Sequence, residues 1–275
     1  MITRNAIIIF SPGDEQNYLP GAVRDVENFV NYRCSPKGGL WRKDEIIVLE
    51  DPSFDEALWH VDHSPADYQD IYFTGHGATQ NNKRLIAFKD GLVPDTWLLN
   101  DNPRQLIIID ACRNHLPSIS GIPEAEDLYS SFDGISQARR LFDQYILNSP
   151  FGKMIIHATH DGAIANDISH LGGAFSYTLL NAAAVLSTGI EYAPVYIEQL
   201  LPYVTRQLFL QGCEQNPGIV YTEGDLKVPF MLDAPQITKQ RSIQPIETSP
   251  ATPGWLPLLG ISLAIYGISQ LLNER

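Results

Sequence analysis

The fold of this chain is decided by residues 105–114, which read QLIIIDACRN. Their apolar run ends on the carboxylate of Asp110, a pattern typical of a strand that is buried on both faces of a parallel sheet. An earlier run of the same kind, residues 71–74, leads directly into Gly75-His76-Gly77. We therefore predict two neighbouring parallel strands whose carboxyl ends lie roughly 4.8 Å apart.

His76 and Cys112 each lie two residues beyond the end of one of these predicted strands. Open α/β sheets place their sites at this edge, and a thiol beside an imidazole forms a nucleophile–base pair. The glycines around His76 let backbone N–H groups approach a substrate, so the N–H groups of Gly77 and Cys112 are the candidate oxyanion hole. The alternative is a buried core cysteine and a hydrogen-bonded structural histidine.

The overall composition is that of an ordinary globular protein. The 275 residues are 44% apolar and 19% charged, enough for one or two domains with a large core. A net charge of -13 argues against nucleic acid and anionic membrane surfaces as partners. The three cysteines, Cys34, Cys112 and Cys213, are far apart and form no disulfide framework, which favours a reducing compartment. The amino terminus has no signal-peptide pattern, so we expect a cytoplasmic protein.

Strands and helices alternate along the chain, which predicts an α/β fold with a mostly parallel sheet. In the first predicted helix, which opens at Pro20, the apolar face contains Val23, Val26, Phe29 and Val30, and we expect Asp25 to face elsewhere. Loops are expected over residues 118–134 and from the end of the predicted strand 153–158 up to Gly173. The predicted strands are 6–10, 45–49, 71–74, 85–88, 106–110, 153–158 and 218–221. The predicted helices open at 20 or span 55–62, 94–99, 136–147, 175–186 and 195–210.

The carboxyl-terminal part changes character. We predict a globular domain over residues 1–233, a Pro-rich linker over 234–253 and an apolar helix over 254–275. Residues 255–272 carry no charge and are just long enough to span a bilayer. They are predicted to anchor the chain to a membrane, with Lys239 and Arg241 on the cytoplasmic side, or alternatively to pack on a partner protein.

Two motifs resemble a known family. YFTGHG at 72–77 and IIIDACRN at 107–114 look like the catalytic motifs of the caspase-like cysteine peptidases, peptidase family C14. LPGAVRD at 19–25 is similar to the family's first-helix motif, and weaker similarities extend the match from Ala6 to Leu232. The resemblance implies a caspase-like three-layer sandwich, with the mostly parallel sheet flanked by helices. It also implies His76 as general acid and base and Cys112 as nucleophile.

The residues around Cys112 resemble the metacaspase-like branch in its bacterial form. In that branch, aspartates that match Asp110 and Asp25 line an acidic S1 pocket. Caspases carry an arginine near the first helix that binds a substrate aspartate, whereas this chain has Leu19. Two carboxylates would pair with a basic side chain, and arginine is favoured over lysine because a guanidinium can bridge both. Alternatively, Asp110 caps the next helix and Asp25 is solvated.

We predict no metal or other cofactor. Calcium dependence occurs in metacaspases, but Ser118 and Ser120 stand where acidic ligands are expected. The acidic run over residues 124–127 is more typical of solvated surface than of a calcium cage. Two His-x-x-His spacings, at 60–63 and 157–160, lack further ligands and are interpreted as structural or surface residues.

The sequence thus predicts a cysteine endopeptidase that cuts protein or peptide substrates after Arg, and less well after Lys. The alternatives are an inactive caspase-like scaffold that binds partners and is recruited by its terminal helix, or a transpeptidase with the same acyl-enzyme. Arg139-Arg140 lies between Cys112 and the next strand, so it is a candidate site of self-cleavage.

Overall fold

The computed structural model describes residues 2–80, 83–111, 113–115, 132–160, 165–168 and 170–234. Cys112 and the tail from residue 235 onward lie outside these ranges. The described residues belong to one compact unit, Met1–Lys239, and a second unit, Gln240–Arg275, lies wholly outside them. The predicted domain division, linker and terminal helix therefore stay predictions.

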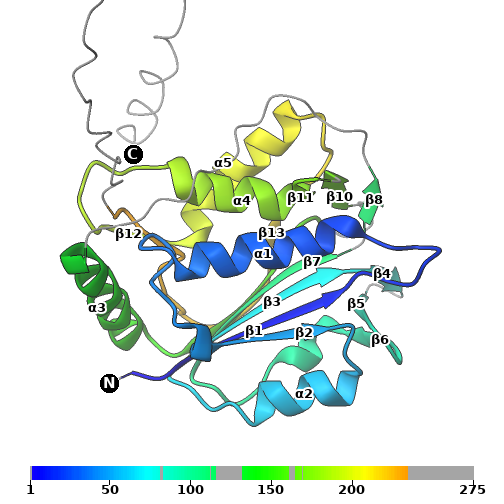
Figure 1. The fold of residues 1–275 in the computed structure, drawn as a ribbon, viewed down its shortest axis with the longest axis horizontal. Helices are drawn as coiled ribbons and strands as arrows, with labels where there is room; N and C mark the ends of the chain where they lie inside the picture. The colour runs from blue at the N-terminus through cyan, green and yellow to red at the C-terminus, as the bar shows by residue number, and fades with distance from the viewer. Residues whose placement is uncertain are drawn as a thin grey trace, which may run out of the picture. The chain divides into compact units, whose positions relative to one another are not determined.

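A six-stranded sheet forms the centre of the described unit (Figure 1), in the order β13-β9-β7-β3-β1-β2. All neighbouring strands are parallel except β13, which runs antiparallel to β9. The mostly parallel sheet is as predicted. Its strands are β1 (Arg4–Ser11), β2 (Ile46–Glu50), β3 (Tyr68–Gly75), β7 (Arg104–Ala111), β9 (Gly152–His157) and β13 (Gly218–Gly224).

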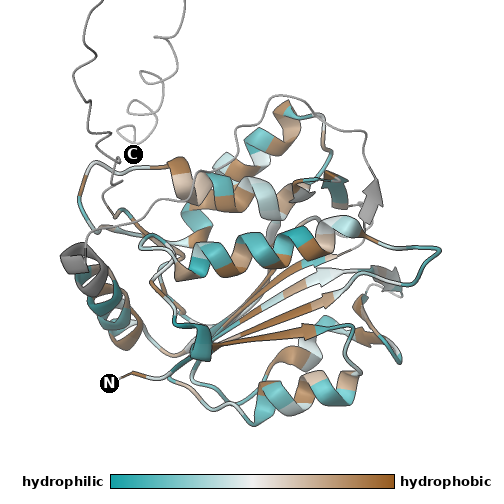
Figure 2. Ribbon diagram, viewed as in Figure 1, coloured by the Kyte–Doolittle hydropathy of each residue, from teal (hydrophilic) through white to brown (hydrophobic). Residues whose placement is uncertain are grey.

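The three central strands, β1, β3 and β7, are buried almost throughout, and Figure 2 shows them as strongly hydrophobic. Successive side chains of a strand point to opposite faces, so each apolar run feeds two cores. Ile8 and Ile108 pack in the larger core, and Ile7 and Ile107 in the smaller one. Each buried isoleucine contributes roughly 1.5–3 kcal/mol of transfer free energy, which explains why these runs define the fold.

Helices cover both faces of the sheet. The larger core lies under α1 (Pro20–Cys34), α3 (Phe132–Asn148), α4 (Ala174–Val185) and α5 (Ile197–Leu210). The smaller core lies under α2 (Phe54–Asp62) and the 3₁₀ turn η2 (Asp95–Leu98). A second 3₁₀ turn, η1 (Lys43–Glu45), precedes β2. The three layers of the predicted sandwich are visible in Figure 1.

Three small sheets surround the central one. The first, which begins right after His76, contains β4 (Gly77–Gln80), β5 (Lys83–Phe88) and β6 (Gly91–Pro94). The second contains β8 (Arg113–His115), β10 (Ala165–Ile168) and β11 (Gly172–Gly173). The third pairs β12 (Pro194–Val195) with β14 (Met231–Leu232).

Several local predictions were wrong. The loop expected up to Gly173 contains β10 and β11, whose polar and glycine residues carry no apolar run. Residues 132–134, expected in a loop, already belong to α3. Pro94 ends β6, so η2 starts one residue later, and β14 rather than β13 is the last strand. Within the described ranges no helix is long and apolar enough to cross a bilayer, and residues 255–272 lie outside these ranges.

Asp25 was expected to face away from the core, and that prediction was wrong. The buried side of α1 runs through Ala22, Asp25 and Phe29, at helical spacings of three and four. Val26 and Val30 are only partly buried against the same core. The buried side therefore shares Phe29 with the predicted face but is rotated away from the valines, and this rotation brings Asp25 inside.

Candidate functional site

The carboxyl ends of β3 and β7 bring the two predicted motifs together. In the parallel register, Thr74 lies opposite Asp110 and Gly75 lies opposite Ala111. β3 and β7 therefore end at the same level, and His76 is the first residue after β3. Cys112 lies outside the described residues, but the backbone on both of its sides belongs to strands, β7 before it and β8 after it.

The His76 imidazole is held by the loop that joins β1 to α1. Its Nε2 lies 2.6 Å from the backbone carbonyl oxygen of Asn17. A carbonyl oxygen can only accept, so Nε2–H donates this bond and the neutral ring has its lone pair on Nδ1. The His76 backbone N–H donates to Ser11 O at 3.2 Å, and its carbonyl accepts from Ala87 N–H at 3.0 Å. The backbone of His76 is thus hydrogen-bonded to β1 and β5. The tautomer leaves the lone pair of Nδ1 to act as a base.

Gly77, the predicted oxyanion-hole residue, opens β4. It pairs with Ile86 in the β4–β5 hairpin, directly after His76. Cys112 lies outside the described residues. That its N–H and the Gly77 N–H together form an oxyanion hole therefore stays a prediction.

Asp25 lies beside this edge and is fully buried. Its Oδ2 accepts from the Thr74 hydroxyl at 2.7 Å, and its Oδ1 accepts from the Gly173 N–H at 2.8 Å. Thr74 is the residue opposite Asp110, so α1 brings Asp25 to the same end of the sheet as the other predicted pocket residue. The structure therefore brings Asp25 and Asp110 to the same strand pair.

Asp110 is also fully buried and contacts the amino end of α4. Its Oδ2 accepts from the hydroxyl and the backbone N–H of Ser176, at 2.6 and 3.2 Å. The Ser176 hydroxyl lies 2.6 Å from the Tyr72 hydroxyl on β3. A carboxylate at a helix amino terminus is stabilised by the helix dipole. The helix-capping alternative therefore applies to Asp110, although the helix is α4 and not the next one in the chain.

A third buried carboxylate, Asp167 on β10, was missed by the sequence reasoning. A Cβ added to Gly21 of α1 would lie 1.8 Å from Asp167 Oδ1, and one added to Gly172 would lie 2.2 Å from Asp25 Oδ1. Asp167 also pairs with Gly173, the residue whose N–H binds Asp25. Glycine is required where α1 crosses β10 and β11, and the two glycines were the available signal.

The described residues contain no group of three or more His, Cys, Asp or Glu side chains placed to hold a metal ion. The acidic run over 124–127 lies outside them. His157 is buried and its Nε2 lies 2.6 Å from Asp95 Oδ2, a pair that joins β9 to η2. His157 is thus a buried structural residue in this fold.

Comparison with known proteins gives a family and a fold. The family model described as the caspase domain, of peptidase family C14, matches residues 42–226. The crystal structure of caspase-1 from Spodoptera frugiperda is similar with a TM-score of 0.50 and 15% sequence identity. That similarity covers 80% of this chain and 87% of the other. No curated protein matches this chain.

At this level of identity the solved structure establishes the caspase-like fold, and the predicted fold class is confirmed. The family match spans more than half of the 275 residues and includes both His76 and Cys112. The metacaspase-like branch and a bacterial origin stay predictions. The chain belongs to the caspase-domain family, and this membership implies a cysteine-type peptidase.

Proposed function

We propose that this chain is a cysteine endopeptidase that cuts protein substrates after basic residues, arginine better than lysine. Cys112 is the nucleophile and His76 the general acid and base. The observation that carries the proposal is the register of β3 and β7, in which His76 follows the residue opposite Ala111. The two adjacent strands end at the same level, and His76 and Cys112 are the next residues in sequence, which supports a nucleophile–base pair.

The tautomer of His76 suits the first chemical step. Nδ1 takes the proton of the Cys112 thiol, and the sulfur attacks the carbonyl carbon of the scissile peptide. The backbone N–H groups of Gly77 and Cys112 stabilise the oxyanion that forms. Nδ1–H then protonates the leaving amine, the C–N bond breaks and a thioester remains.

Hydrolysis of the thioester uses the same groups in reverse. His76 Nδ1 takes a proton from water, and the oxygen attacks the thioester carbonyl. The carbon–sulfur bond breaks, the acid product leaves, and the imidazolium returns its proton to Cys112. During both steps the Asn17 carbonyl stabilises the positive charge on the ring, because it accepts from Nε2–H.

The acidic pocket is assigned to Asp25 and Asp110, with Asp167 as an addition from the structure. All three carboxylates are fully buried, and they come from α1, β7 and β10 at one end of the sheet. Charge interactions are stronger at buried positions than in water, so such carboxylates attract a guanidinium and repel a substrate aspartate. We therefore favour a basic P1 residue over an acidic one.

The test is a peptide library with varied P1 residue, cleaved by the wild type, Cys112→Ala and His76→Ala. We expect cleavage after Arg, weaker cleavage after Lys, and none with Cys112→Ala. A peptidyl-arginine chloromethyl ketone should label Cys112 in the wild type, as mass spectrometry of tryptic fragments would show. Cleavage after Asp would contradict the pocket assignment. Absence of both cleavage and labelling would instead favour the inactive scaffold.

A further inference from the structure

The loop that contacts His76, residues 12–19, is held in shape by one of its own side chains. The Asp14 carboxylate accepts through Oδ1 from the backbone N–H groups of Gln16, at 3.0 Å, and Asn17, at 3.2 Å. The Asn17 N–H also reaches the Asp14 carbonyl at 3.1 Å. An aspartate that binds the backbone N–H two residues ahead forms a turn that resists other backbone conformations. The peptide before Asn17 is therefore held on two oxygens of one residue.

The other side of Asn17 is closed by a separate bond. The Leu19 N–H donates to the Pro12 carbonyl at 2.8 Å, and the side chain of Leu19 is buried. The Asn17 carbonyl thus lies between two anchored points of the loop. Its direction toward His76 Nε2 depends on both of them.

Gly13 provides the space for this arrangement. A Cβ at this position would lie 2.6 Å from His76 Nε2, 2.8 Å from its Cδ2 and 2.9 Å from Asn17 O. The Gly13 φ angle of +88° is also one that side chains disfavour. Hence the imidazole and the carbonyl both pack directly against the Cα of Gly13.

We infer that Asp14 and Gly13 are positioning residues for the His76 imidazole. Asp14 fixes the turn that directs the Asn17 carbonyl at Nε2–H, and Gly13 leaves room for ring and carbonyl together. The turn thereby selects the tautomer with Nδ1 as base. The kinetic part of this inference rests on the proposed peptidase function, whereas the tautomer does not.

Substitutions at Asp14 separate the hydrogen bonds from the charge. In Asp14→Ala we expect kcat to fall roughly 10- to 100-fold at similar KM, because small misplacements of a catalytic group have effects of that size. Asp14→Asn keeps an oxygen acceptor and should recover activity close to the wild type. Glu15→Ala is the matched control, since Glu15 is an exposed acid of the same loop. Equal losses in Asp14→Ala and Glu15→Ala, or no rescue by Asp14→Asn, would contradict the inference.

Gly13→Ala tests the space beside the ring. We expect a loss of kcat at least as large as for Asp14→Ala, because the new methyl group displaces the imidazole. Gly212→Ala is the matched control, since Gly212 has a similar φ angle of +78° and no atom within 4 Å of an added Cβ. It should carry a comparable backbone strain and keep full activity. If the two variants lose equal activity, strain and not the contact with His76 is the cause.

Nitrogen-15 NMR of the imidazoles gives a readout that needs no turnover. The spectra are recorded on Cys112→Ala protein, and the His76 signal is identified by its loss in His76→Gln. We expect the Nε2–H tautomer with intact Asp14 and a mixture of tautomers in Asp14→Ala. An unchanged tautomer in Asp14→Ala would overturn the inference even if peptidase activity is found. A shifted tautomer in a chain without peptidase activity would uphold it while the proposed function fails.

Discussion

At the scale of single residues, the question is whether the Asp25 carboxylate binds substrate or only stabilises the fold. Asp25 is fully buried and accepts from Thr74 and Gly173, so its loss removes structure as well as charge. A ratio between two substrates avoids this ambiguity. Citrulline has the shape of arginine without its positive charge. A purely structural role would therefore affect peptides with arginine or citrulline at P1 equally.

We predict that Asp25→Asn lowers the preference for arginine over citrulline at least tenfold, measured as the ratio of kcat/KM values. Removal of one partner of a buried charge pair costs about 2–5 kcal/mol, and each tenfold change corresponds to about 1.4 kcal/mol. Thr74→Ala is the control, because it removes one hydrogen bond from Asp25 and leaves the carboxylate. Its preference should stay close to the wild type. An unchanged ratio in Asp25→Asn would remove Asp25 from the pocket.

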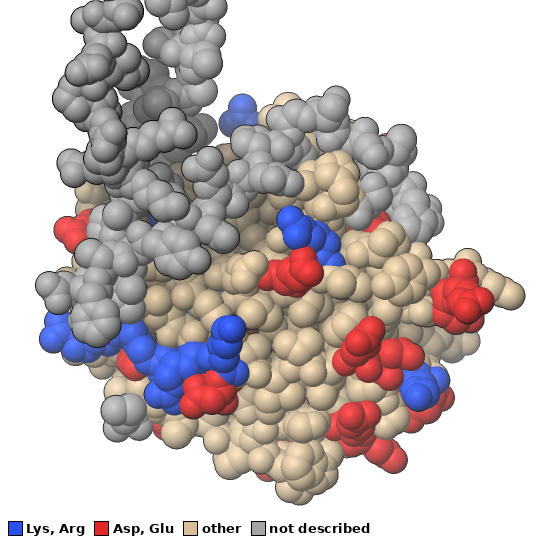
Figure 3. Space-filling model, in the orientation of Figure 1, with Lys and Arg blue, Asp and Glu red and all other residues tan. Residues whose placement is uncertain are grey.

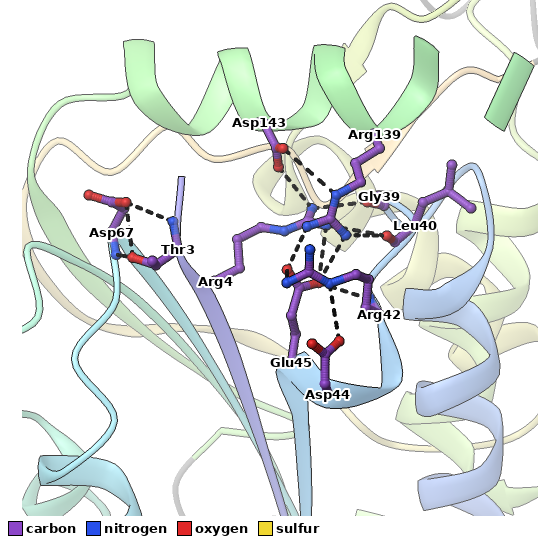
Figure 4. A network of polar contacts seen from close by, with 10 residues as sticks. All are labelled: Thr3, Arg4, Gly39, Leu40, Arg42, Asp44, Glu45, Asp67, Arg139 and Asp143. Carbon is purple, nitrogen blue, oxygen red and sulfur yellow. Dashed lines mark hydrogen bonds and ion pairs between the residues drawn. The ribbon is translucent and has the colours of Figure 1, made fainter. Parts of the chain in front are cut away.

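At the scale of elements, α3 is attached to the opposite end of the sheet by a network of charges (Figure 4). Arg139 donates to Glu45 at 2.5 and 2.9 Å and to the Leu40 carbonyl at 2.7 Å. The side chain of Arg4 is fully buried between Glu45, at 3.5 Å, and Asp143, at 3.4 Å. Burial lowers the pKa of Arg4 to about 10, against the opposing effect of Asp143. The network joins β1, η1 and α3, the helix that follows the nucleophile segment in sequence.

The two acids of this network have pKa values that shift in opposite directions. Burial would raise the pKa of Glu45, but the hydrogen bonds from Arg139 and the Arg42 backbone, with the nearby charge of Arg4, lower it overall. For Asp143, burial dominates and raises the pKa, although Arg4 and Arg139 oppose the shift. The ionised form of Glu45 thus stabilises the folded state, whereas the ionised form of Asp143 is disfavoured by folding.

We predict that Glu45→Gln lowers the free energy of unfolding by about 1–3 kcal/mol at pH 7, the usual loss for a hydrogen bond to a charged group. The pKa of Glu45 is lowered in the folded state, so its contribution is present above the ordinary value of 4.5 and is lost as the pH falls through the folded pKa. The difference between wild type and variant should therefore be the same at pH 7 and 5.5 and shrink as the pH falls below 4.5. Urea unfolding at pH 7, 5.5 and 3 measures it.

Asp143→Asn is the matched variant in the same network. Burial raises the pKa of Asp143 in the folded state, so folding disfavours its ionised form. We expect a smaller loss than for Glu45→Gln at pH 7 in the same urea series. If Asp143→Asn is the more destabilising of the two, the opposite shifts assigned to these acids are wrong.

The same helix bears on self-cleavage. Arg139-Arg140 lies inside α3, and Arg139 is engaged with Glu45. A peptidase binds its substrate as an extended segment, so cleavage here requires α3 to unwind first. We predict that active protein, incubated at high concentration, yields no new amino terminus at residue 140 or 141. Amino-terminal sequencing checks this, and Glu45→Gln, which loosens α3, is the variant in which such a terminus should appear first.

Elements with an apolar run were predictable from the sequence, and those held together by polar contacts were not. The strands β1, β3 and β7 were predictable from their hydrophobic runs. Because parallel strands end at one edge of the sheet, the sequence also predicts a site there that contains His76 and Cys112. The short strands β10 and β11 carry no such run. They are formed by their backbone pairing and by the close approach to α1 that glycine allows, so the sequence carries no hydrophobic signal for them. Asp167 was missed for this reason. The turn at Asp14 has an acidic and polar sequence that is typical of any surface loop. Its contact with His76 becomes apparent only in the structure.

At the scale of the whole molecule, the last question is what residues 255–272 add to the domain. The chain has a net charge of -13, and on the face drawn in Figure 3 the described acidic and basic side chains are interspersed. The domain should therefore be repelled by anionic lipid and have little affinity for neutral lipid. Any binding to neutral vesicles can then be assigned to the apolar stretch, whose 18 residues are uncharged.

We predict that the full chain sediments with neutral phosphatidylcholine vesicles and that a chain ending at Pro250 does not. The shortened chain keeps every residue assigned to the site, so its kcat/KM on a soluble arginine peptide should be within twofold of the full chain. A triple substitution of Leu258, Leu259 and Ile261 to Ser keeps the length and should also release the protein from vesicles. If the full chain stays in the supernatant, the stretch packs on protein and does not enter lipid. If truncation abolishes activity while His76 keeps its tautomer, the stretch contributes to substrate binding, because the catalytic geometry is then intact without it.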